Sequence, residues 1–113
     1  MFDMFKMMGK LGEVQQKMAD VKEKLKTISL EESELDGVVV VEITADRTIK
    51  KIRTSDEFYS KYSKEEREEI LTEALNNAIQ KADARAKEER QNAMQGVIPN
   101  IPGMDLSSLM GGL

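Results

Sequence analysis

The sequence "GVVVVEITADRTIKKIR", residues 37–53, decides the fold, because it is the one stretch that cannot be read as a helix. Its β-branched run predicts a strand over residues 37–45, and the second Ile-containing run predicts another over residues 48–54. Together they predict a β-hairpin. Successive valines point to opposite faces of a strand, so both faces are apolar near its start. Such a strand needs cover on both sides, and a second copy of the chain is the simplest source of the second layer.

The tip of this hairpin is Asp46-Arg47. Two-residue hairpin loops require positive φ at both positions, which would strain Arg47, so we expect a longer loop built on a type I turn. Ile49 and Ile52 lie three residues apart, which breaks strict alternation. A β-bulge near the lysine pair between them would bring both to one face.

The N-terminal segment predicts a long helix over residues 3–26. Apolar residues recur there with three- and four-residue spacing, which is a heptad-like stripe. The stripe either packs on its own domain or also pairs with another chain, and the sequence leaves both alternatives open. Its members are Met4, Met7, Leu11, Val14, Met18, Val21, Leu25 and Ile28.

The remaining segments complete an α-β-β-β-α order. Residues 27–33 alternate and predict a short first strand, followed by a turn over residues 34–37. Ser63 followed by Glu66 forms a capping box, which predicts a second long helix that continues to about Met94. Small residues recur every four positions along this helix and allow a close approach to a neighbour: Ala74, Ala78, Ala82 and Ala86.

These elements predict one α+β domain over residues 1–95, followed by a flexible tail over residues 96–113. The tail contains both prolines of the chain and no apolar period.

Composition excludes several classes of function. The chain has 113 residues, enough for one domain, and contains neither Cys nor His, which removes thiolate chemistry and the usual general base and metal ligand. No P-loop, dinucleotide fingerprint or metal-binding pattern is present, so we expect no enzyme, no cofactor, no metal and no small-molecule substrate. No apolar run is long enough for a membrane span, and Asp3 and Lys6 interrupt any signal-peptide core, so we expect a cytoplasmic protein.

The succession of segments resembles the YbaB/EbfC family of bacterial nucleoid-associated proteins. The resemblance rests on "MFKMMGKLGEVQQKMADVKEKL", "LDGVVVVEITADRTIKKIRTSDEF", "EILTEALNNAIQKADARAKEERQNAM" and the late "IPGM". The sequence departs from the family pattern at the hairpin tip, where Asp46-Arg47 includes no Gly.

This resemblance implies a homodimer whose sheets associate centrally and whose helices project outward. The residues expected at its interface are Val38, Val39, Val40, Val41, Ile43, Ile49 and Ile52. The resemblance also implies binding to duplex DNA, a location in the nucleoid, and roles in nucleoid organisation and gene expression.

The charge of the chain does not by itself indicate a nucleic-acid partner, because the net charge is −4. The charges are segregated, however: residues 1–27 carry six Lys and four acids. Basic side chains would contact phosphates and give little sequence preference. The residues expected to face DNA are Lys10, Lys17, Lys22, Lys24, Lys26, Lys81, Arg85, Lys87 and Arg90.

Two other functions compete with DNA binding. A dimeric scaffold could bind partner helices through the Met-bearing stripe without binding DNA. Peripheral membrane attachment through "MFDMFKMM" is the less favoured alternative, because Lys6 is the only base in that segment.

Overall fold

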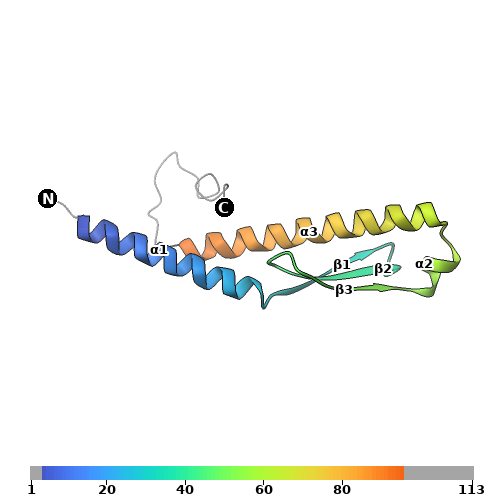
Figure 1. Ribbon diagram of the computed structural model, residues 1–113, viewed down its shortest axis with the longest axis horizontal. Coiled ribbons are helices and arrows are strands. Elements are labelled where there is room, and N and C mark those ends of the chain that lie inside the picture. Colours follow the sequence, from blue (N-terminus) through green and yellow to red (C-terminus); the bar gives the residue numbers. More distant parts are fainter. Residues whose placement is uncertain (1–3, 96–113) are drawn as a thin grey trace.

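The computed structural model describes residues 4–95, with side chains from residue 8 onward. The elements run in the predicted α-β-β-β-α order, with one short helix added before the last (Figure 1). The tail predicted for residues 96–113 lies outside the described residues. The elements are α1 (Met4–Leu25), β1 (Ser29–Glu34), β2 (Val39–Thr44), β3 (Ile49–Thr54), α2 (Asp56–Ser60) and α3 (Lys64–Met94).

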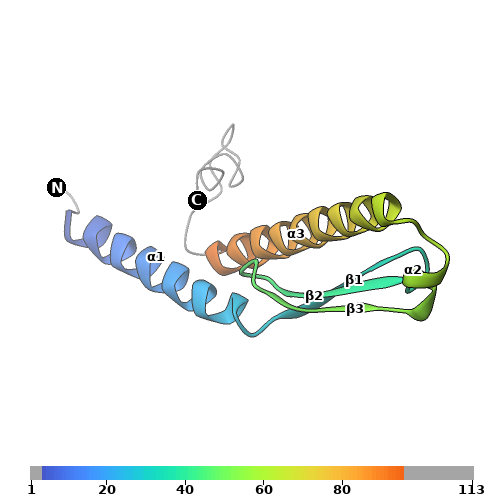
Figure 2. The ribbon, with the colours of Figure 1, turned by 45° about the vertical axis from the view of Figure 1, so that its right-hand side comes forward.

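The three strands form one antiparallel sheet in the order β1-β2-β3. α3 lies along one face of this sheet, over β1 and β2, in both views (Figures 1 and 2). The molecule is elongated, with principal extents of 72 × 28 × 18 Å. Among residues 4–95, no helix combines the length and the apolar character needed to cross a membrane.

A line of alanines lets α3 lie close to the sheet. Ala74, Ala78 and Ala82 recur every four residues and have no exposed surface. The β2 side chains in the same core cluster are also completely buried: Val39, Val41 and Ile43. The predicted close approach of this line to a neighbour is confirmed, and the neighbour is the sheet of the same chain.

The opposite face of the sheet is polar beyond Val40, which is half-buried at the start of β2. Glu31, Glu42 and Lys51 are cross-strand partners on this face, and Arg53 lies opposite Val40. Arg53 donates a hydrogen bond to Glu31 at 2.7 Å and lies 3.2 Å from Glu42. The hydrogen bond to Glu31 is the main cause that raises the pKa of Arg53. The prediction of two apolar faces concerned only the start of the strand, where Val40 is the one apolar β2 residue on this face.

The hairpin tip forms the longer loop that was predicted. The Arg47 amide donates to the Thr44 carbonyl at 3.0 Å, and the Thr44 amide donates to the Thr48 carbonyl at 2.8 Å. Arg47 nonetheless adopts positive φ, at 72°, as the last residue of a three-residue loop does. The bulge is also confirmed, because Glu42 pairs with Lys51 while Ile43 pairs with Ile49.

The side chain of Arg47 holds the hairpin tip on α3. Its Nε and Nη2 atoms each donate a hydrogen bond of 2.6 Å to the carboxylate of Asp83. This bidentate pair raises the pKa of Arg47 and lowers the pKa of Asp83. The contact therefore fixes the flank of α3 that carries Asp83 on the β3 side of the sheet.

The start of α3 follows the prediction, whereas α2 does not appear in it. The Ser63 side chain accepts from the Glu66 amide and the Glu66 side chain accepts from the Ser63 amide, which completes the capping box. α2 begins after Ser55, and its Phe58 is only 3% exposed, in the same core cluster as Val38. α2 thus closes the end of the core where β3 leads into α3.

Candidate nucleic-acid interface

The ends of α1 and α3 pack together and place basic residues from both helices at one end of the molecule. Val21 and Leu25 of α1 are buried in a cluster with Ala86 of α3 and Ala45 of the hairpin. The first half of α1 extends beyond the end of α3 in both views (Figures 1 and 2). Among the side chains that the structure describes, those of the α1 stripe are therefore buried only near its C-terminal end.

A buried carboxylate joins the two helices. Glu89 of α3 is only 8% exposed, Lys24 Nζ of α1 lies 2.7 Å from it, and Arg85 Nε lies 3.9 Å away. The hydrogen bond from Lys24 is the main cause that lowers the pKa of Glu89 below its ordinary value. Lys24 thus holds α1 to α3, whereas Arg85 contacts Glu89 within α3, and both bases have less charge to offer to an external anion.

The basic residues predicted to face DNA fall into two groups. The first group forms ion pairs with acids of the same chain: Lys24, Lys26, Lys81 and Arg85. The second group has no ion pair with any described side chain: Lys10, Lys17, Lys22, Lys87 and Arg90. The second group is the better candidate for phosphate contacts, because no internal partner has to be released first.

The unpaired bases lie on two sides of the contact between α1 and α3. Lys10 and Lys17 are seven residues apart, so they share one face of α1, and the same spacing continues to Lys24 beside Glu89. On another side, Lys22 and Arg90 line one groove between the helices, with a volume of about 290 Å³. The structure therefore gathers bases from both ends of the sequence around one helix pair.

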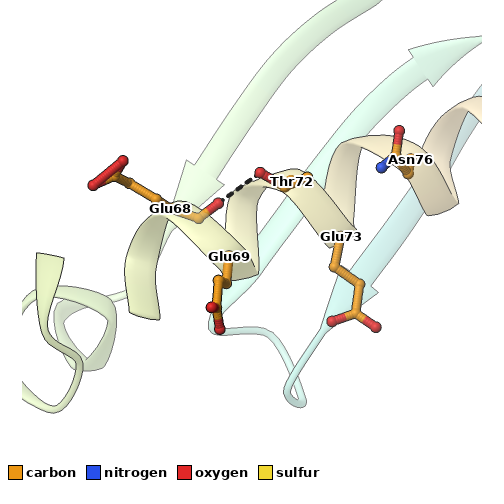
Figure 3. Close-up of a pocket in the computed structure, with 5 residues that line it drawn as sticks. All are labelled: Glu68, Glu69, Thr72, Glu73 and Asn76. Atoms are coloured by element: carbon orange, nitrogen blue, oxygen red, sulfur yellow. Dashed lines mark hydrogen bonds between the residues drawn. The ribbon is translucent and has the colours of Figure 1, made fainter. Parts of the chain in front are cut away.

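The start of α3 has the opposite charge. Figure 3 shows Glu68, Glu69 and Glu73 on the first turns of α3, around a pocket of about 400 Å³ that Thr72 and Asn76 also line. No described residues form a cluster of His, Cys, Asp or Glu suited to a metal ion. A phosphate backbone would be repelled from this end, so any duplex should lie at the other.

Two basic residues were not singled out from the sequence as a site. Lys50 and Lys51 of β3 are exposed and form no ion pair with the described side chains, whereas Arg47 and Arg53 beside them do. The basic run over residues 47–53 was the available signal. Sequence alone does not show that its arginines are paired internally while its lysines are not.

The residues predicted for a dimer interface also separate into two groups. Some are buried within the single chain and have almost no surface to offer to a second copy: Val38, Val39, Val41 and Ile43. Val40 is half-buried on the polar face, while Ile49 and Ile52 are 39% and 41% exposed. Only these last three remain available in the folded chain.

Comparison with known proteins places this fold in a family. Residues 1–97 match the family model described as the YbaB/EbfC DNA-binding family. The chain belongs to the YbaB/EbfC family. A nucleoid-associated protein of Flavobacterium johnsoniae is 38% identical over 103 residues, which cover 91% of this chain and 95% of that protein. One from Afipia carboxidovorans is 31% identical, covering 94% and 99%.

A solved structure shares the fold of this YbaB/EbfC family member. The crystal structure of an uncharacterized protein from Helicobacter pylori superimposes with a TM-score of 0.70 and covers 83% of this chain and 99% of that one. The sequences are only 19% identical, so this similarity supports the α-β-β-β-α architecture but not a function.

Proposed function

We propose that this protein is a nucleoid-associated protein that binds duplex DNA largely without sequence preference. The observation that carries the proposal is the set of bases around the α1–α3 pair that form no ion pair with a described side chain: Lys10, Lys17, Lys22, Lys87 and Arg90. Membership in a family described as DNA-binding supports the same partner and agrees with the expectation of a non-enzymatic protein.

The segregation of charge gives the interface a direction. α1 and the last part of α3 each carry more bases than acids, and residues 81–95 hold four bases and three acids. Residues 55–80 hold seven acids and three bases. We infer that the duplex lies against the α1–α3 pair and that the acidic start of α3 points away from it. Lysine contacts to phosphates fix position without reading bases.

A homodimer is part of the same proposal, and we infer its surface from the side of the sheet that α3 leaves uncovered. Asn77 and Lys81 of α3 bond to β1, so that flank of α3 faces β1. The opposite flank carries Asp83, which pairs with Arg47 of the β2–β3 hairpin, and the main contacts of α3 are with β1 and β2 rather than with β3. Half-buried apolar side chains of α3 and exposed ones of β3 are available on this side, and we call them the α3–β3 strip: Leu71, Leu75, Ile79, Ile49 and Ile52.

A second copy seated on the α3–β3 strip would cover these side chains and leave α1 projecting. Two basic helix pairs on one dimer could contact separate parts of a duplex and bend or bridge it. We infer from this arrangement a role in nucleoid organisation, with consequent effects on gene expression. The relatives are named nucleoid-associated proteins, which supports a location in the nucleoid.

The deciding experiment is a fluorescence-anisotropy titration of labelled duplex at about 50 and 200 mM salt, with molar mass measured by light scattering. For about 4–6 phosphate contacts, the log–log slope should be about −4 to −5, so affinity should fall about 250- to 1,000-fold between the two salts. Affinity that ignores salt would refute the phosphate interface.

A matched pair of variants locates the interface. The K10Q/K17Q double variant should flatten the salt slope by about 0.9 for each phosphate contact that is lost. The control K61Q/K64Q removes the same charge at the acidic end of α3 and should leave the slope unchanged. Equal effects of the two pairs would contradict the proposed orientation.

A protein-interaction scaffold is the second candidate, and the exposure of Met8 and Leu11 on α1 favours it. The same titration separates the two functions. A dimer that binds no duplex at either salt concentration would be consistent with the fold and the dimer. It would refute DNA binding and support a scaffold that binds protein partners.

A further inference from the structure

The apolar stripe of α1 loses its cover toward the N-terminus. Val21 and Leu25 are buried, whereas Val14 and Met18 are half-buried. Leu11 is 62% exposed in the continuation of the same stripe, and Met8 is 64% exposed beside it. Exposed apolar side chains are normal when they are scattered, but these lie in a row at helical spacing. The row therefore has the form of a helix face that no described residue covers.

The end of α3 lies beside the point where this cover stops. Ala93, near the last residue of α3, packs on the cluster that contains Val21 and Leu25. α1 continues past that point in both views (Figures 1 and 2). The chain therefore leaves α3 next to the uncovered part of the α1 stripe.

The segment that follows α3 has the composition to cover this stripe. Residues 96–113 contain apolar side chains throughout and a single charged one, Asp105. Met8 and Met18 are ten residues apart on the helix, or about 15 Å. Residues 96–113 can span up to roughly 60 Å when extended. The segment is therefore long enough to cover the roughly 15 Å of helix between Met8 and Met18. The apolar side chains are Val97, Ile98, Ile101, Met104, Leu106, Leu109, Met110 and Leu113.

We propose that residues 96–113 dock on α1 of the same chain, over exposed Leu11, half-buried Val14 and Met18 of the stripe, and exposed Met8 beside it. Tethering favours this occupant over a free partner. A segment attached by a short linker has an effective concentration on the order of 1 mM, so an intrinsic Kd of about 0.1 mM would keep the site about nine-tenths occupied. The proposal does not depend on DNA binding, and its test contains no DNA.

A spin label on this segment tests the proposal directly. The chain has no cysteine, so Ser108→Cys provides a single attachment site for a nitroxide. In the full chain, amide signals of residues 8–18 should lose about half or more of their intensity, because a site that is mostly occupied keeps the nitroxide beside α1. Signals of β3 should change little. Equal losses on α1 and β3, or no loss on α1, would overturn the proposal.

Two further samples make the result specific. Adding I101S, L106S and L109S to the labelled chain keeps its length and charge, and should restore the α1 signals. Broadening that survives these changes would reflect mere proximity and would refute apolar docking. In a mixture of isotope-labelled native chain with spin-labelled, isotopically unlabelled chain, α1 should remain sharp. Broadening there would assign the stripe to another copy instead.

Discussion

The α3–β3 strip offers the sharpest test of the proposed dimer, through the double variant I49T/I52T. Thr keeps the β-branched shape that suits a strand, so the sheet should persist. Ile49 and Ile52 retain 39% and 41% of their surface in the single chain. Fully burying an Ile side chain stabilises by about 1.5–3 kcal/mol, so completing the burial is worth about 0.6–1.2 kcal/mol for each.

A two-fold dimer contains two copies of each isoleucine and would bury all four side chains. Together they should contribute about 2–5 kcal/mol to association. The dimer dissociation constant should therefore rise by a factor of about 30 to 4,000. Sedimentation equilibrium over a range of protein concentrations measures this constant. The control is Leu35→Ser, which removes an apolar side chain with similar exposure, 51%, from the β1–β2 turn. If I49T/I52T associates as tightly as this control, the strip is not the dimer contact.

Two other perturbations test what holds the helices in place. The lowered pKa of Glu89 means that its ion pair stabilises the fold fully above the ordinary value of 4.5 and loses this contribution as pH falls through the lowered value. Urea unfolding from pH 6 down to about pH 3 should therefore show a steeper loss of stability in the native chain than in Glu89→Gln, and parallel curves would contradict this role. Ala78→Leu should destabilise the fold by about 1–3 kcal/mol, because Ala78 is completely buried in one core cluster with the β2 side chains. An unchanged thermal midpoint would show that α3 can shift away from the sheet.

The sequence allowed most of the fold to be predicted wherever local pattern and tertiary packing agree. The capping box at Ser63 gives the start of α3 because its two hydrogen bonds are local. The alanine line predicts close packing because small side chains at four-residue spacing share one helix face. α2 was missed because a helix of five residues leaves no periodic signal, and only the burial of Phe58 explains its place.

The candidate site was predictable in its composition but not in its pairing. Both Lys17 and Lys24 are lysines on the same face of α1, and no sequence pattern distinguishes them. The structure does, because Glu89 meets Lys24 across the helix contact while no described acid pairs with Lys17. Long-range ion pairs depend on how helices are docked, and that information is not contained in local spacing.

The acidic net charge does not oppose DNA binding at the proposed surface, because screening makes only nearby charges count. The Debye length is about 10 Å at 0.1 M salt. Glu68 and Lys87 lie on the same continuous helix, nineteen residues apart by sequence number, which corresponds to about 28 Å along its axis. A phosphate at Lys87 would therefore be almost three screening lengths from the acidic cluster.

At low salt the screening length grows to about 30 Å at 0.01 M, so the acidic end should begin to oppose binding there. The log–log salt dependence should accordingly flatten below about 0.02 M salt in the native chain, and less so in a variant with Glu68, Glu69 and Glu73 changed to Gln. A plot that stays linear and identical for both proteins would show that the two ends do not interact even without screening.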